Sequence, residues 1–442
     1  MNKFVFSALF TVLIFCSVSC TSTPKHTNKV YNELGKVLVV EYHRIASDEG
    51  EWVRSPEKFR ADLERYYNLG YQLVSIKDLF NNSYVDIPEG KKPLIITFDD
   101  GHPTQLRFLI ENGTTVEGDG GFPKVDPNCA VGILDDFCKK HRDFGKSAAF
   151  FVNSIMFYQS ECPSLWKQKL QYLVKTGREI GNHTYDHDDL SELSYNEIKK
   201  TLALLQAKIE EALPSYEACS VALPFGILPK KGKWLLQSGS YMGKSYNYKV
   251  SFLVGAAPTL PPYHKDFDPA LVQRVQASDK ELNKWLSEIE KRPEEYYLSD
   301  GNPNIISVQE KDLDKVDKTA LKAGMKIRVS RGREVIKDIT IESKKNRISR
   351  ARTAERGVYY TFYSAGISKR IDDLIENYKK TGLNTLVVDM KDVEGTIGVS
   401  IEVPLAKEIG ASDVLYVKDL RALIKKLHDA GIRVSARIAV FK

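Results

Sequence analysis

Two short stretches of the sequence combine carboxylate and imidazole side chains in a pattern that suits metal chemistry. Asp99 and Asp100 follow directly after an apolar run, and two ionised carboxylates side by side would repel each other unless a cation binds one of them. His183 and His187 are four residues apart, which on a helical turn would place both imidazoles on one face. An aspartate and two histidines would give a divalent ion three ligands and leave positions open for water and substrate.

Each stretch also has a simpler interpretation. A lone Asp-Asp-Gly sequence is often a polar turn that ends a strand, and surface histidines also occur four residues apart. Only the combination of the two stretches favours a catalytic metal site.

The elements that must position these residues alternate between strands and helices from residue 36 to about 293. A helix is predicted from Pro56 to Gly70, and another begins at the capping box formed by Ser194 and Glu197. Apolar runs predict strands at residues 37–42, 71–76, 93–98, 147–152 and 219–223. This alternation predicts an α/β fold with a parallel sheet or barrel.

Both stretches resemble motifs of the polysaccharide deacetylases of carbohydrate esterase family 4. Residues 97–101 reproduce the family motif TFDDG, and residues 183–187 reproduce H-[ST]-x-x-H in the same order. The resemblance implies a distorted (β/α) barrel in which Asp99 is the general base. It implies that the metal ligands are Asp100, His183 and His187. Zn²⁺ is the favoured ion for such a set, and Co²⁺ or Ni²⁺ would also be accepted.

A third segment is similar to the family motif R-x-P-Y-G, which lines the substrate groove. Its counterparts here are Pro224, Phe225 and Gly226, which the resemblance assigns to substrate binding. Ala222 occupies the position where arginine is common, so this sequence leaves open how Asp99 is held in place.

The general acid is predicted from the order of the motifs. The usual family has a histidine near the C-terminal end of the domain, but neither His264 nor His428 fits that position. Tyr42 and His43, at the end of the first strand, are similar to the N-terminal Tyr-His motif of biofilm poly-N-acetylglucosamine deacetylases, whose motif order is circularly permuted. This resemblance implies that His43 is the acid, whereas a histidine that merely ends a strand is the alternative.

Together these residues predict metal-dependent removal of acetyl groups from N-acetylglucosamine units of a cell-surface or extracellular polysaccharide. Two alternatives stay open. One is a deacetylase of peptidoglycan or chitin oligomers, and the other is a carbohydrate-binding surface lipoprotein impaired in catalysis, which the missing arginine would favour. A net charge of +6 over 442 residues, without a basic stripe, argues against a nucleic-acid partner. A hydrophobic content of 42% excludes a wholly disordered chain or a multi-span membrane protein.

Residues 1–20 predict a lipoprotein signal peptide. Lys3 precedes an apolar stretch, residues 4–18, which is short for a membrane span, and Ser19 and Cys20 resemble the lipobox of bacterial lipoproteins. The resemblance implies an exported protein whose lipidated Cys20 anchors it in the cell envelope, at the outer membrane or the periplasmic face. Plain signal cleavage is the alternative.

Residues 21–35 predict a tether. In an exported protein, four more cysteines would lie in an oxidising compartment, where disulfides can form. The sequence does not determine which of them pair: Cys129, Cys138, Cys162 and Cys219.

Three segments follow the signal and the tether. We assign residues 36–295 to the deacetylase domain and residues 296–355, where the apolar period changes to two, to a β-rich spacer and linker. Residues 356–442 resemble the start of a family of glycoside-hydrolase-like (β/α)₈ barrels, and three predicted strands make this barrel incomplete. The resemblance implies sugar binding at the strand ends by Asp389 and Asp392, with a surface salt bridge as the alternative. No glycosidase activity is predicted, because a second carboxylate at the required separation cannot be located.

Overall fold

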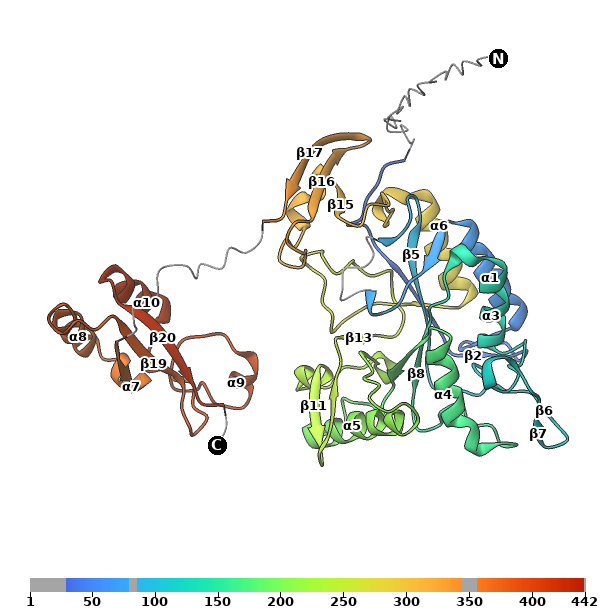
Figure 1. Cartoon of the computed structure of the whole chain (residues 1–442), viewed down its shortest axis with the longest axis horizontal. Coiled ribbons are helices and arrows are strands. Elements are labelled where there is room, and N and C mark those ends of the chain that lie inside the picture. Colours follow the sequence, from blue (N-terminus) through green and yellow to red (C-terminus); the bar gives the residue numbers. More distant parts are fainter. Residues whose placement is uncertain (1–28, 79–85, 343–355, 441–442) are drawn as a thin grey trace, which may run out of the picture.

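Figure 1 shows the computed structural model of the chain, which describes residues 29–78, 86–342 and 356–440. The predicted signal peptide and Cys20 lie outside the described residues. Within the described ranges, no helix combines the length and the apolar character needed to cross a bilayer.

The first unit is built on an open, eight-stranded sheet whose paired strands are all parallel. The strands follow the spatial order β13-β10-β9-β8-β5-β1-β14, and β4 pairs with β5. All five residues of β1 are buried, as a run that is apolar except for Glu41 predicts for a strand covered on both faces. The bounds are β1 Leu38–Tyr42, β4 Tyr71–Leu73, β5 Lys92–Phe98, β8 Ala149–Val152, β9 Glu179–Asn182, β10 Ser220–Ala222, β13 Val250–Phe252 and β14 Val275–Gln276.

Helices lie outside this sheet (Figure 1). The helix α1 begins as predicted, because the side chain of Ser55 accepts a hydrogen bond from the Lys58 amide and Pro56 occupies the first turn. The capping box at Ser194 and Glu197 starts α5. The helices of this unit are α1 Pro56–Asn68, α3 Ala130–Lys140, α4 Trp166–Lys175, α5 Tyr195–Ala212 and α6 Asp279–Lys291. The half-barrel of parallel strands with outer helices confirms the predicted α/β class.

Short paired strands form the loops of this unit. They are β2 Arg44–Ile45 with β3 Val53–Arg54, β6 Ile110–Glu111 with β7 Thr114–Thr115, and β11 Ser238–Tyr241 with β12 Lys244–Asn247. The first of these pairs lies next to the end of β1 in the chain and contributes to the site described below.

The β-rich segment shares a hydrophobic core with the large sheet. Its strands β15 Ile305–Gln309, β16 Lys326–Arg331 and β17 Glu334–Thr340 form a mixed three-stranded sheet. Val308 and Ile327 belong to the same buried cluster as Val39 of β1 and Ile95 of β5. The face of the large sheet opposite α1 and α5 therefore continues into the smaller sheet.

The end of the predicted tether is part of this junction. Asn32, Glu33 and Leu34 are buried, although polar composition had placed residues 21–35 in a solvated tether. The reason is that the Glu33 carboxylate accepts hydrogen bonds from the Ser307 amide at 2.8 Å and from the Ser299 hydroxyl at 3.0 Å. A polar residue can be buried where the fold supplies such hydrogen-bond partners.

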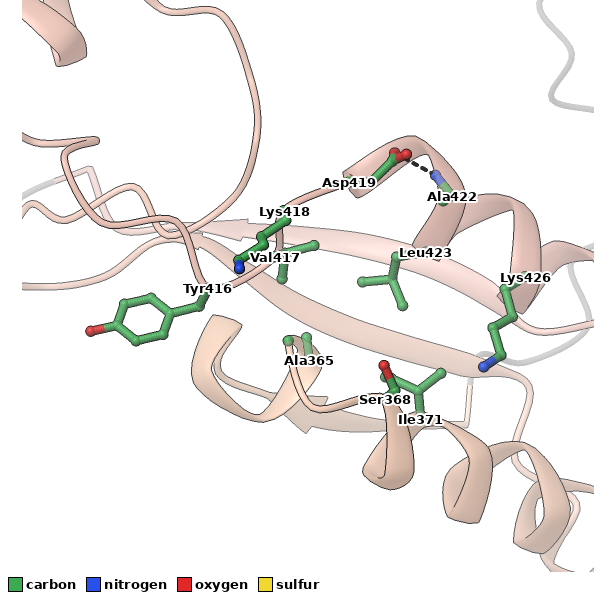
Figure 2. Close-up of a pocket in the computed structure, with 11 residues that line it drawn as sticks. Ala365, Ser368, Ile371, Tyr416, Val417, Lys418, Asp419, Ala422, Leu423 and Lys426 are labelled. Carbon is green, nitrogen blue, oxygen red and sulfur yellow. Dashed lines mark hydrogen bonds between the residues drawn. The ribbon is translucent and has the colours of Figure 1, made fainter.

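Residues 356–440 form a separate hydrophobic core around three parallel strands in the order β18-β19-β20. The elements are β18 Gly357–Tyr360, α7 Phe362–Ala365, α8 Ser368–Thr381, β19 Thr385–Lys391, α9 Pro404–Glu408, α10 Leu420–Asp429 and β20 Arg433–Ile438. This unit has a hollow of about 460 Å³. Figure 2 shows the side chains that line it, which come from α7, α8, α10 and the segment before α10. Ile371 is buried and Leu423 half-buried, whereas Lys418 and Lys426 are exposed.

Candidate active site

The candidate site lies where parallel strands of the large sheet end. His43 follows β1, Asp99 and Asp100 follow β5, His183 follows β9, and Phe225 lies just beyond β10. Carboxyl ends of parallel strands open on the same edge of a sheet, which is where ligands bind in open α/β folds. Residues that are up to 182 positions apart in the sequence, from His43 to Phe225, therefore meet at one edge.

Asp100, His183 and His187 form a group with the composition and spacing of a metal site. Asp100 Oδ1 lies 3.3 Å from His183 Nε2 and 3.4 Å from His187 Nε2. Nδ1 of His183 is 2.9 Å from the Ala222 carbonyl oxygen, and an N–H there leaves the Nε2 lone pair for a metal. Nε2 is buried and has no hydrogen-bond partner within the described ranges. An Asp-His-His set with an orphaned imidazole nitrogen fits a divalent ion such as Zn²⁺.

The two histidines converge through a loop and not through the helical turn that their spacing predicted. After β9 the backbone is irregular, and Thr184 and His187 have φ values of 59° and 58°. The Asn182 side chain accepts a hydrogen bond from the Thr184 amide, and the Thr184 hydroxyl accepts one from the Asp188 amide. These local bonds replace helical ones and turn both imidazoles toward Asp100.

Two other residues of the site share this uncommon backbone conformation. Asp100 has a φ of 78° and Phe225 a φ of 59°. Non-glycine residues in the left-handed region cost free energy, and such strain gathers at functional sites. The strain therefore supports a functional assignment on grounds that do not depend on motifs.

Asp99 is held by an arginine that the sequence analysis did not identify. Arg274, next to β14, donates from both terminal nitrogens to the two carboxylate oxygens of Asp99 at 2.7 Å, and both side chains are fully buried. Burial alone would raise the pKa of Asp99, but the positive charge of Arg274, its hydrogen bonds and the nearby His183 together outweigh burial and lower the pKa to about 2. Arg274 thus supplies the cation whose usual position is occupied by Ala222.

Glu41 is the second residue that the sequence analysis missed. It lies within β1, and its Oε2 is 3.3 Å from Arg274 Nε and accepts a hydrogen bond from the Gly255 amide at 3.1 Å. Burial raises the pKa of Glu41 to about 7, against the opposing charge of Arg274. One arginine therefore serves two buried carboxylates, of which Asp99 keeps the negative charge.

The predicted acid His43 stands next to Glu41. Its Nε2 is 3.8 Å from Glu41 Oε1, an oxygen that has no hydrogen-bond partner within the described ranges. Burial lowers the pKa of His43, although the charges on Asp99 and Asp100 act in the opposite direction. An imidazole with a carboxyl group beside it can hold and release a proton near the reacting centre.

Some of the other residues singled out in the sequence lie at the site, and others lie far from it. Pro224 is buried and Phe225 is 59% exposed, with its ring centroid 4.7 Å from that of His187. A Cβ on Gly226 would come within 2.7 Å of the Val254 amide nitrogen, which explains the glycine. His264 lies elsewhere, because it forms a bridge with Val316 next to the small sheet. Four cysteines in the described ranges are free: Cys129, Cys138, Cys162 and Cys219.

In the C-terminal unit, the two predicted sugar-binding residues have structural partners. The buried Asp389 accepts a hydrogen bond from Arg437 at 2.8 Å and another from the Tyr359 hydroxyl. Asp392 accepts a hydrogen bond from the Thr396 amide at 2.8 Å and so closes a turn. The hollow in Figure 2 has one carboxylate in its lining, Asp419, which caps α10. This lining lacks the pair of carboxylates on which most glycoside hydrolases depend.

Comparison with known proteins identifies two family matches. Residues 132–242 match the polysaccharide deacetylase family, and residues 357–442 match a family described as "Putative glycosyl hydrolase domain". The first match includes His183, His187 and Phe225. Three further residues of the site lie outside the matched range, and the fold brings them to the same place: His43, Asp99 and Asp100.

Individual relatives are distant. An uncharacterised 30.6 kDa protein of Geobacillus stearothermophilus is 30% identical over 151 residues, which is 34% of this chain and 44% of the relative, so the match spans under half of that protein. The Streptococcus pyogenes deacetylase PplD in complex with acetate is 16% identical, with a TM-score of 0.41 over 56% of this chain and 97% of that chain. IcaB from Ammonifex degensii is 18% identical, with a TM-score of 0.38 over 57% of this chain and 95% of that chain.

Proposed function

This chain carries a polysaccharide deacetylase domain, and on that premise we propose that it removes acetyl groups from N-acetylglucosamine units of an extracellular polysaccharide. The observation that carries the proposal is the convergence of three metal-type ligands with a buried, ionised carboxylate and a histidine. Asp100, His183 and His187 would hold the metal, while Asp99 and His43 would act on the substrate. Hydrolysis of an amide needs a proton acceptor for water and a proton donor for nitrogen, and the site offers both.

A bound divalent ion would supply Lewis-acid polarisation of the acetyl carbonyl and a lowered pKa for water. Asp99, kept ionised by Arg274, accepts the proton of the attacking water at its carboxylate. His43 donates a proton to the departing nitrogen. Acetate and a glucosamine unit are the products.

Arg274 also bears on the alternative of a catalytically impaired binding protein. That alternative depended on the absence of arginine at position 222, which left Asp99 without a partner. Because Arg274 provides a two-point contact to Asp99 from another strand, the base has the support that catalysis needs. We therefore favour an active enzyme. A peptidoglycan or chitin-oligomer deacetylase with the same catalytic residues remains the second candidate, distinguished by substrate alone.

For the location of the protein we propose export and lipid attachment at Cys20. The support is the sequence around that residue, an apolar stretch that ends in Ser19 and Cys20. An enzyme anchored in this way would meet polysaccharide outside the cytoplasm.

Acetate release from defined N-acetylglucosamine oligomers tests the proposed function. We expect the full chain to release acetate, to lose this activity on chelation, and to regain it with Zn²⁺ or Co²⁺. Oligomers of chitin and oligomers of the biofilm polymer separate the two candidate substrates. If the metal-loaded protein released no acetate from either series, the proposed function would be wrong.

A further inference from the structure

One large aromatic side chain next to the site has no role in the proposed chemistry. Trp52 lies in the loop between β2 and β3, and its ring centroid is 4.7 Å from that of His43 at an interplanar angle of 56°. The side chain is nevertheless 39% exposed. An exposed apolar surface beside a buried polar site often marks a place where a ligand binds.

The loop that carries Trp52 is held in place on several sides. The Trp52 carbonyl accepts a hydrogen bond from the Arg44 amide at 3.1 Å, and the Glu51 carbonyl accepts one from the Gln276 side chain at 2.9 Å. Two residues further on, Arg54 forms a 2.6 Å ion pair with Asp62 of α1. The ring therefore keeps its position before any ligand arrives, which lowers the entropic cost of binding.

A second exposed ring, that of Phe225, lies next to a metal ligand. Phe225 contacts His187, whereas Trp52 contacts His43, so an aromatic surface borders the site at the acid and another at the metal. The faces of a pyranose ring present C–H groups, and the negative face of an aromatic ring attracts them as it attracts the positive edge of another ring. Two such surfaces, one at His43 and one at His187, suit a ligand longer than one sugar.

We infer that Trp52 binds the pyranose ring of the sugar unit that neighbours the reacting unit on the His43 side. The site then selects a polysaccharide chain over a single sugar, and the acetyl group is taken from a unit that has a bound neighbour. This inference rests on the proposed function, because it assumes that the reacting group is an N-acetylglucosamine unit at the metal ligands.

Kinetics with substrates of two lengths test the inference. We expect Trp52→Ala to lower the ratio of kcat/KM for the N-acetylglucosamine pentamer to kcat/KM for the monomer by about tenfold, mainly through KM. Trp52→Phe keeps an aromatic face and should restore the ratio to within about threefold. If Trp52 served only to orient His43, the alanine variant would lower kcat for monomer and pentamer alike and leave the ratio unchanged, and the inference would be wrong.

Intrinsic fluorescence gives a readout that does not depend on turnover. The pentamer, added to the chelated protein, should change the tryptophan emission of the wild type, and Trp52→Phe should abolish this change. Trp285→Phe is the matched control, because Trp285 packs against the core from α6, and it should keep the change. A change that survives in Trp52→Phe would overturn the inference. The experiment also separates the two proposals, since a wild type that binds the pentamer through Trp52 but releases no acetate refutes only the proposed function.

Discussion

Replacing Arg274 with methionine should raise the pKa of Asp99, so that this carboxyl group stays protonated to a higher pH than in the wild type. Both oxygens of Asp99 accept hydrogen bonds from this guanidinium at 2.7 Å, and no part of either side chain is exposed. Two opposite charges about 4 Å apart interact by about 4 kcal/mol at an effective dielectric constant of about 20. Since one pKa unit corresponds to 1.36 kcal/mol, the loss of the cation should raise the pKa of Asp99 by about three units.

The pH dependence of kcat/KM measures this change. The base is active only when ionised, so the acidic limb of the profile should move from about pH 2 in the wild type to about pH 5 or above in Arg274→Met. Loss of the two-point contact should also misplace Asp99 and lower the maximal rate by about 10²-fold. Arg274→Lys keeps the charge without the paired contact, and should show the lower rate with a smaller shift of the limb.

The Arg274→Met variant needs a control for lost stability, because leaving a buried carboxylate without its partner lowers the free energy of unfolding by about 3–5 kcal/mol. Arg178→Met supplies it, since Arg178 is also a buried arginine paired with an aspartate, Asp135, away from the site. We expect this variant to unfold more easily yet to keep the wild-type pH profile. An Arg274→Met enzyme with the wild-type rate and acidic limb would refute the assignment of Arg274 as the partner of the base.

Four further outcomes can be measured. His187→Ala should lose both bound metal, measured by elemental analysis, and acetate release; a variant that keeps stoichiometric metal would contradict the ligand set. Asp99→Asn and His43→Ala should keep the metal and slow acetate release by about 10²-fold or more. The pH profile of kcat/KM should lose its acidic limb in Asp99→Asn and its alkaline limb in His43→Ala. Burial raises the pKa of Glu33 from 4.5 to about 8, so the folded state binds the Glu33 proton more tightly than the unfolded state does. The free energy of unfolding should therefore fall by up to about 5 kcal/mol as the pH rises from 4.5 to 8. Urea unfolding of Glu33→Gln should lack this pH dependence, and an unchanged dependence would exclude Glu33 as its source. Cys20→Ser should move the protein from the membrane fraction to the soluble fraction, and unchanged fractionation would favour plain signal cleavage.

Local signals explain which elements could be predicted. The β1 strand follows from a run that is apolar except for Glu41, and α1 and α5 follow from capping residues that form the expected hydrogen bonds. The helix α4 was not predicted, and no side chain caps its first turn. Its formation depends on packing, with Leu170 and Leu173 buried in the common core, and such contacts leave no local signal.

The residues of the candidate site likewise fall into those with a local sequence signal and those without one. Asp99, Asp100, His183 and His187 belong to contiguous motifs, and the structure brings the last three together as predicted, although through a loop instead of a helix. Arg274 could not be linked to Asp99, because 175 residues separate them and only the parallel pairing of β1 with β14 brings Arg274 to the site. An arginine next to the apolar residues Leu271, Val272 and Val275 was the one available signal.

The contacts of Glu33 have a consequence for how this protein reaches its folded state. Its carboxylate binds Ser299 and Ser307, which are 266 and 274 residues away, so the beginning and the end of the first unit close on each other. Such distant contacts slow folding, because a long loop must close before they form. A chain that emerges from the ribosome cannot complete the contacts of its first unit until the small sheet has followed. Until then the apolar residues that await it stay exposed, and a chaperone that shields them would raise the yield of folded protein.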